Sequence, residues 1–152
     1  EVGALKNRTE KIKLPLIDNI LKSNEEHALR LLNLIHATKA KKVLFCGVTF
    51  KENVDDFRDS PLLKIAKKLS KSNDIKVKVL DYKKVTSKLN LKTTSMDNVL
   101  KLDEFDLLIL GPYKLDDKTI KQVKRKNKTV IDLLWHKEYQ TLSKNSNYLR
   151  YN

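Results

Sequence analysis

The sequence predicts an α/β protein, in which a mostly parallel sheet flanked by helices is preceded by one long helix. Three observations predict this class. From residue 41 onward, short apolar runs rich in β-branched residues alternate with helical stretches, the pattern of strand–helix–strand crossovers. The run 107–110 is apolar throughout, as expected for a strand covered on both faces. Residues before about 40 show a helical pattern alone. We therefore divide the chain into a helical segment, 1–40, and an α/β domain, 41–152.

The helical segment is expected to run from Ala4 to about Thr38. Pro15 suits the first turn of a helix, because its fixed φ is already helical. Apolar residues then recur at three- and four-residue spacings: Leu16, Ile20, Leu21, Leu29, Leu32 and Ile35. A helix from Pro15 to Thr38 would be about 35 Å long, more than a small α/β domain covers. The excess favours packing on another domain or on a second copy of the chain, and an ordinary core helix is the alternative.

The α/β domain is expected to contain its elements in a regular order. Strands are predicted at 41–48, 75–81, 107–111 and 129–134, helices at 60–72, 95–102 and 116–126, and a final edge strand at 148–151. This alternation predicts a Rossmann-like domain. In open sheets of this type, ligands bind beyond the carboxyl ends of the strands.

Composition limits the classes of function. A chain of 152 residues with 40% hydrophobic residues can bury a core without disulfides or metal. One cysteine and three scattered histidines provide no metal-ligand spacing, so we expect no metal. No apolar run approaches the roughly 20 residues that span a bilayer, so we expect no membrane partner. The first residues lack the apolar core of a secretory signal, and a cytoplasmic location is the expectation.

The net charge of +13 has two interpretations. One is a footprint for nucleic acid or another polyanion. The other is solvated lysine-rich faces with a local pocket for an anionic ligand. Because the lysines are dispersed and no aromatic residues are interleaved with them, we favour the second interpretation and expect no nucleic-acid partner.

The loop after the first predicted strand holds most of the chemistry. It starts at Gly47, contains Lys51 and Arg58, and ends at Ser60-Pro61, a good N-cap followed by a good first helical residue. The partial positive charge of the helix N-terminus and the two cations predict a phosphate site. Three acids are expected to orient the cations: Asp55, Asp56 and Asp59. An ordinary N-cap with surface ion pairs is the alternative.

A glycine-rich dinucleotide fingerprint is missing from this loop. Of the pattern G-x-G-x-x-G that would follow the first strand, only Gly47 is present. Binding of NAD by this domain alone is therefore not expected.

The segment LFCGVTFKENVDDFRDSP closely resembles the G-x-x-F-K-x-x-T-D-D-x-R-E-S-P hallmark of the UDP-glucose/GDP-mannose dehydrogenase family. The stretch IKVKVLD is similar to the family's next strand, although Tyr82 replaces the usual proline after Asp81. Residues 4–27 resemble the central-helix region, and the ending TVIDLLW is more similar to the GDP-mannose branch, because the Asp-Gly-Arg of the UDP-glucose branch is missing. The resemblance covers essentially the whole chain.

The resemblance implies a specific chemistry. Enzymes of this family oxidise a sugar 6-hydroxyl to a carboxylate with two NAD molecules, through a thiohemiacetal and a thioester on a cysteine. That cysteine lies in a G-G-x-C-x-x-K-D motif, and Glu1 matches the position of the motif's catalytic aspartate. The cysteine and the N-terminal domain that binds most of the NAD are expected outside these residues. The resemblance also implies a homodimer built through the central helix.

The resemblance also implies roles for individual residues. Phe50 and Lys51 match the Phe-Lys pair that contacts the sugar nucleotide, and Arg58 matches the arginine that reaches NAD on the N-terminal domain. Two positions depart from the hallmark: Val54 replaces the usual threonine and Asp59 the usual glutamate.

Two further residues invite a functional interpretation. Cys46 lies inside an apolar run, so we expect a small buried hydrophobe with a raised pKa rather than a nucleophile. Trp135, followed by His136, lies at the end of a strand, where a guanine base could stack on it; structural packing is the alternative.

The sequence therefore predicts the C-terminal portion of an NAD-dependent nucleotide-sugar 6-dehydrogenase. Such a piece binds a nucleotide sugar and dimerises but performs no oxidation alone. Two alternatives stay open: a non-catalytic Rossmann-like binding module with a basic surface, and a degenerate dehydrogenase paralogue. The choice between GDP-mannose and a UDP-sugar also stays open.

Overall fold

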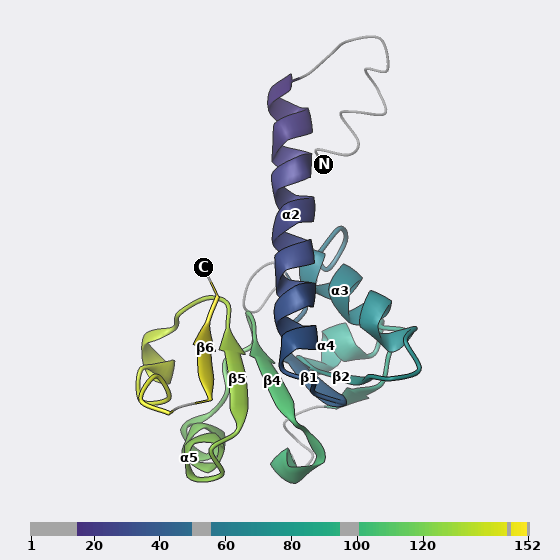
Figure 1. Cartoon of the computed structure of the whole chain (residues 1–152). Helices are drawn as coiled ribbons and strands as arrows, with labels where there is room; N and C mark the ends of the chain where they lie inside the picture. Colours follow the sequence, from purple (N-terminus) through teal and green to yellow (C-terminus); the bar gives the residue numbers. More distant parts are fainter. Residues whose placement is uncertain (1–14, 50–55, 95–100, 146, 152) are drawn as a thin grey trace. The chain divides into compact units, whose positions relative to one another are not determined.

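The computed structural model describes residues 15–49, 56–94, 101–145 and 147–151 (Figure 1). The chain divides into two compact units, Glu1–Ala37 and Thr38–Asn152. Among the described residues, no helix is long and apolar enough to cross a membrane.

The described part of the first unit is a long helix, α2, at Pro15–Ala37. It has 23 residues and begins at the proline that the sequence placed in the first turn. Two of its large apolar side chains are exposed, Ile20 and Leu29, the latter at 56%. The predicted helical residues 4–14 lie outside the described part of the chain.

The second unit contains a six-stranded sheet, and every described strand pair in it is parallel (Figure 1). The strand order is β3-β2-β1-β4-β5-β6. The strands are β1 (Lys42–Cys46), β2 (Lys76–Leu80), β3 (Thr93–Thr94), β4 (Leu107–Leu110), β5 (Thr129–Asp132) and β6 (Tyr148–Arg150). This is the order of a doubly wound dinucleotide-binding sheet. The predicted α/β class is therefore confirmed, including the edge strand near the C-terminus.

Among the described residues, short helices connect the strands: α3 (Pro61–Ser70), α4 (Lys83–Thr86), η1 (Leu102–Glu104), α5 (Asp117–Arg125) and η2 (Lys137–Tyr139). Most of the predicted helix at 95–102 is not tested, because residues 95–100 lie outside the described part. Its last residue, Leu102, begins the 3-10 turn η1. The sequence also did not predict α4 or β3, because four- and two-residue elements are too short to show a period.

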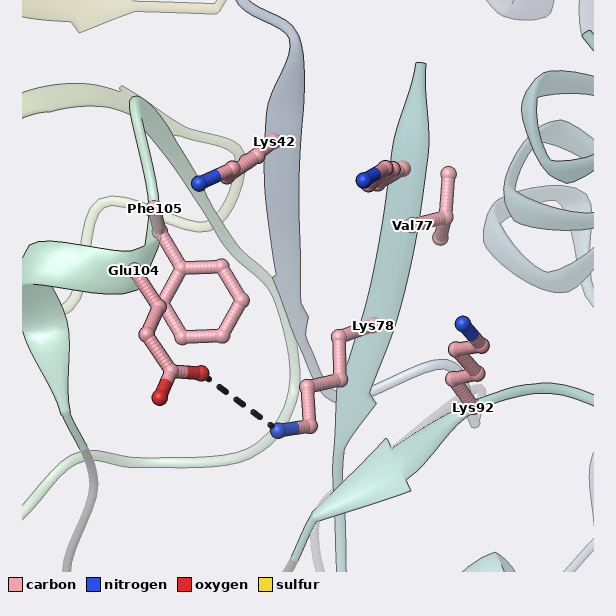
Figure 2. A pocket seen from close by; sticks show the side chains of 7 residues that line it. Lys42, Val77, Lys78, Lys92, Glu104 and Phe105 are labelled. Carbon is pink, nitrogen blue, oxygen red and sulfur yellow. Dashed lines mark ion pairs between the residues drawn. The ribbon is translucent and has the colours of Figure 1, made fainter. Parts of the chain in front are cut away.

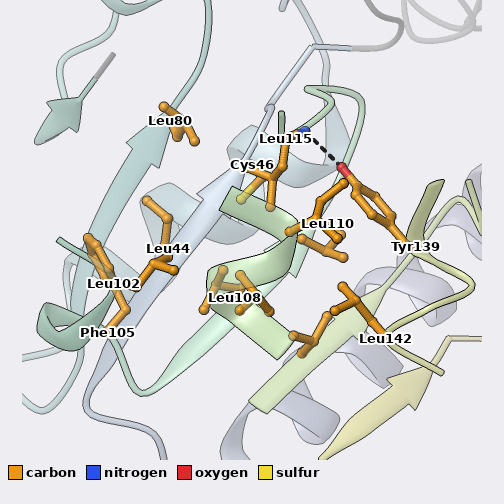
Figure 3. Close-up of a cluster of buried hydrophobic side chains, with 13 residues drawn as sticks. Leu44, Cys46, Leu80, Leu102, Phe105, Leu108, Leu110, Leu115, Tyr139 and Leu142 are labelled. Atoms are coloured by element: carbon orange, nitrogen blue, oxygen red, sulfur yellow. Dashed lines mark hydrogen bonds between the residues drawn. The ribbon is translucent and has the colours of Figure 1, made fainter. Parts of the chain in front are cut away.

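The core on one sheet face is built from alternate strand residues and the helices that cover them (Figure 3). Its members include Leu44 and Leu108, which are register partners on β1 and β4, and Ile120 and Val123 of α5. Tyr139 is fully buried here, and its hydroxyl accepts a hydrogen bond from the Leu115 N–H at 3.0 Å. Each leucine buried in this way contributes about 1.5–3 kcal/mol to the free energy of unfolding.

The opposite face of the sheet is also apolar. The strand residues that point to this side are buried, namely Val43, Phe45, Val77 and Val79. Helix α3 contacts β2 and buries its own apolar stripe, Leu63, Ile65, Ala66 and Leu69. Burial on both faces leaves the strand ends as the places where the domain can hold polar groups.

Candidate functional site

The sheet has a switch point between β1 and β4, where the chain turns away in opposite directions beyond the strand ends. Such a point is where open α/β sheets bind their ligands. Gly47 lies here with a φ of +90°, and a Cβ on it would lie 2.4 Å from the backbone nitrogen of Tyr113. A Cβ on Gly111 would lie 2.9 Å from the carbonyl oxygens of both Cys46 and Gly47. The two loops therefore meet backbone to backbone, which requires glycine at both positions.

A buried carboxylate holds the start of the loop after β1. Asp81 follows β2, and its two oxygens accept hydrogen bonds from the Val48 N–H at 2.9 Å and the Tyr82 N–H at 2.8 Å. Burial raises the pKa of Asp81, and the two amide hydrogen bonds act in the opposite direction. Asp81 thus fixes the direction in which the loop leaves β1.

Ser60 ties the end of the same loop to its beginning. Its side-chain oxygen accepts the Leu63 N–H at 3.3 Å, which is the predicted N-cap of α3. The same hydroxyl donates to the Val48 carbonyl oxygen, and Ser60 is buried. The two described ends of the loop, at Val48 and Ser60, are therefore tied together at the carboxyl edge of the sheet.

Arg58 pairs with Asp56 at the exposed side of the loop. The guanidinium donates twice to the carboxylate, from Nε and from Nη2, at 3.0 Å each. These hydrogen bonds lower the pKa of Asp56 to about 2. Because the pKa of Asp56 is depressed, its ion pair with Arg58 is fully formed at pH values above the ordinary pKa of an aspartate. The ion pair is lost as the pH falls toward 2. The side chain of Arg58 is 86% exposed, and the two hydrogen bonds to Asp56 orient its guanidinium.

Asp59 behaves differently from the prediction. It was expected to orient the loop cations, but it pairs with Lys64 of α3 at 3.1 Å, and this contact lowers the pKa of Asp59. Its φ is +55°, a conformation in which aspartate is enriched. The aspartate at this position thus fits the local backbone, and only Asp56 fulfils the predicted role among the described residues.

Two tyrosines flank the switch point, and the sequence analysis did not identify them as a pair. Tyr82 follows β2 and Tyr113 follows β4, and their ring centroids are 4.8 Å apart with the planes tilted by 56°. The rings meet beyond the end of β1, which lies between those two strands and is followed by Gly47. Their positions directly beyond strand ends are the signal that could have found them, once the strand order was known.

Trp135 lies on a second part of the carboxyl edge, beyond β5. Asp132, which is fully buried, accepts hydrogen bonds from the N–H groups of Leu134 and Trp135 and from the Tyr148 hydroxyl. The backbone of Trp135 has a φ of +54°, and this bonding pattern maintains it. Burial, followed by the hydrogen bond to Asp132, raises the pKa of Tyr148.

The indole of Trp135 is 45% exposed and covered on one side. The Arg150 guanidinium carbon lies 4.1 Å from the ring centroid, within cation–π distance. The indole N–H donates to the Tyr151 carbonyl oxygen at 3.1 Å. A pocket of about 290 Å³ opens beside it, lined by Trp135, His136, Gln140, Ser143, Tyr148 and Arg150. Nε2 of His136 is buried without a hydrogen-bond partner among the described residues.

The other predicted residues divide into two groups. Cys46 is fully buried, and desolvation raises its pKa further than the nearby charge of Asp81 does, so the expected inert thiol is found. Glu1, Phe50 and Lys51 lie outside the described part of the chain, and so does Val54. No group of three or more His, Cys, Asp or Glu side chains within the described residues could hold a metal ion.

Comparison with known proteins identifies the family. The sequence profile of the UDP-glucose/GDP-mannose dehydrogenase family, UDP binding domain, matches residues 44–142, which is more than half of the chain. This chain belongs to that family. The family resemblance read from the sequence is thereby confirmed.

Individual relatives extend the comparison beyond the matched domain. GDP-mannose 6-dehydrogenase of Pseudomonas putida is 38% identical over 58 residues, which are 38% of this chain and 13% of the relative. The enzyme of the same name from Pseudomonas syringae pv. syringae is 26% identical over 138 residues, covering 81% of this chain and 31% of the relative. The chain therefore spans about a third or less of the length of these relatives.

A solved structure shares the fold. It is a ternary complex of GDP-mannose dehydrogenase from Pseudomonas aeruginosa, with a TM-score of 0.68 and 21% identity. The match covers 98% of this chain and 37% of that one. At this level of identity the likeness supports the architecture.

Proposed function

We propose that this chain is the C-terminal, sugar-nucleotide-binding portion of an NAD-dependent nucleotide-sugar 6-dehydrogenase, with GDP-mannose as the substrate. One observation carries the proposal: the family's hallmark loop starts at the β1–β4 switch point, where Gly47 and Gly111 leave the strand ends free of side chains. The names of the relatives favour GDP-mannose over a UDP-sugar.

Within this proposal each predicted site residue has its own role. Phe50 and Lys51 contact the sugar nucleotide, with Lys51 providing a positive charge for an anionic ligand. Trp135 provides an aromatic surface for the base, since one side of its ring is covered by Arg150 and 45% of the residue remains exposed. Glu1, matched to a catalytic aspartate, belongs to the chemistry of the whole enzyme.

NAD is proposed to bind mainly to a domain outside these 152 residues. The described part of this chain does not fit a dinucleotide by itself, because the space that a glycine cradle would offer at Gly47 is filled by the backbone of Tyr113. Arg58 is suited to one contact with the cofactor, since Asp56 holds an otherwise exposed guanidinium at the edge of the loop. The cytoplasmic location expected from the sequence stays a prediction.

Nucleotide-sugar binding tests the proposal on the chain itself. Titration with GDP-mannose, followed by amide NMR, is expected to shift the signals of Gly47 and Gly111 and the indole N–H of Trp135. UDP-glucose is expected to bind more weakly. In Lys51→Ala the shifts should require a higher concentration, whereas Lys64→Ala, which removes a cation paired with Asp59, should behave as the original chain. Shifts confined to the opposite edge of the sheet, or none at all, would refute the proposal.

The helical segment 1–40 is proposed to form a homodimer. The exposed side chain of Leu29 on α2 offers apolar surface for a second copy, as the family resemblance implies. Leu29→Asp is expected to weaken the dimer at least about 10-fold, because burial of a leucine contributes about 1.5–3 kcal/mol. Asn24→Asp, which adds the same charge at an exposed polar position on a different face of the helix, is the control. Sedimentation that shows a strict monomer at high concentration would rule out this role of the helix.

A further inference from the structure

Four lysines surround an open pocket at the amino edge of the sheet, the edge opposite Gly47. This lysine pocket has a volume of about 260 Å³ and is lined by Lys42, Lys76, Val77, Lys78, Lys92, Glu104 and Phe105 (Figure 2). The lysines come from the start of β1, from β2 and from the residue before β3. Nothing in the proposed dehydrogenase function uses this edge.

Strand register places the cations on one face of the sheet. Lys42 and Lys76 are direct register partners on β1 and β2, and Lys78 lies two residues further along β2, beside Leu44. Residues two apart on a strand point to the same side. The opposite side is occupied by Val77 and its buried neighbours. The lysines therefore stand together over the part of the face that the core leaves open.

The pocket is short of negative charge. Lys78 has a partner, Glu104, with Nζ to Oε2 at 3.8 Å, and its Nζ lies 5.9 Å from the ring centroid of Phe105 (Figure 2). Within the described part of the chain, Lys42, Lys76 and Lys92 make no side-chain ion pair or hydrogen bond. Four lysines and one glutamate leave three positive charges uncompensated.

Two nearby acids bind groups other than the lysine ammonium groups of the pocket. Asp103 pairs with Lys126 and, at 4.0 Å, with Lys128. Asp106 uses one carboxylate oxygen to accept the backbone N–H groups of Lys41 and Lys42, at 2.9 and 2.8 Å. Like charges directly opposite on neighbouring strands destabilise a sheet. A multivalent anion from solution would remove this repulsion.

The arrangement also indicates the shape of the anion. The cations extend over three neighbouring strands, a width of about 10 Å at the usual strand spacing. A short chain of phosphates matches this width better than a single phosphate does. Lysine binds phosphate as a point charge, and the absence of arginine among the lining residues disfavours bidentate recognition of a carboxylate. We propose that the lysine pocket binds a small polyphosphate, of the di- or triphosphate class.

Calorimetric titration of the whole chain with tripolyphosphate tests this proposal. We expect saturable binding of one equivalent that weakens with salt, because the contacts are exposed charges. The double variant Lys42→Gln/Lys76→Gln should bind at least about 10-fold more weakly. It should also unfold no more easily than the original chain without ligand, because the two side chains make no described contact that folding needs.

The matched control removes two exposed lysines of α5, in the variant Lys118→Gln/Lys121→Gln, and should bind within about two-fold of the original chain. Equal weakening in both variants would show diffuse surface charge and overturn the proposal, as would binding without saturation. A 12-base-pair DNA duplex provides a further comparison. If the duplex displaced tripolyphosphate and bound more tightly at equal phosphate concentration, the occupant would be nucleic acid and the proposal would be wrong.

Discussion

Gly47→Ala is expected to lower the free energy of unfolding by about 3 kcal/mol, a large part of the 5–15 kcal/mol typical of a domain. Two costs combine. The φ of +90° lies outside the conformations that an alanine readily adopts, which costs about 1–2 kcal/mol. The new Cβ would also lie 2.4 Å from the backbone nitrogen of Tyr113, and forcing the two loops apart adds about 1–3 kcal/mol. Urea unfolding, followed by circular dichroism, measures the total change in the free energy of unfolding.

The variant Asn127→Ala separates the effect of the positive φ from the effect of the close contact between the loops. Asn127 also has a positive φ, 45°, but it is exposed in the turn between α5 and β5. Its substitution should therefore cost only the conformational part, about 1 kcal/mol. If Gly47→Ala cost no more than Asn127→Ala, the close approach of the two loops at the switch point would be wrong.

The sequence was sufficient to predict those elements whose structure is determined by neighbouring residues. Ser60-Pro61 marked the start of α3, and the apolar run 107–110 marked a strand buried on both faces, because capping and burial depend on neighbouring residues. The element Thr93–Thr94 was missed, since a two-residue strand has no period and exists through its pairing with β2.

The contacts in the site could likewise be predicted only where the two residues are close in the sequence. Asp56 lies two residues from Arg58, and that pair could be anticipated from the sequence. Asp59 has a positive φ and pairs with Lys64, and the sequence shows neither feature. The contact of Tyr82 with Tyr113 needed the strand order, which sets residues 31 positions apart side by side at one edge (113 − 82 = 31).

Lys51→Ala is expected to lower kcat/KM of the intact enzyme by about 30- to 160-fold. A hydrogen bond to a charged group contributes about 2–3 kcal/mol, and each 1.36 kcal/mol corresponds to a factor of ten. Lys64→Ala, which removes a lysine already paired with Asp59, should remain within about three-fold of the original enzyme. Loss of activity in both variants would point to a general effect on this loop and helix.

The proposed dehydrogenase function is tested by NADH formation in the intact protein, with this chain joined to its NAD-binding part, on addition of GDP-mannose. We expect NADH at two equivalents per sugar oxidised, and severe loss of turnover in Lys51→Ala with normal turnover in Lys64→Ala. Absence of NADH with GDP-mannose and with UDP-glucose alike, or normal turnover in Lys51→Ala, would contradict it.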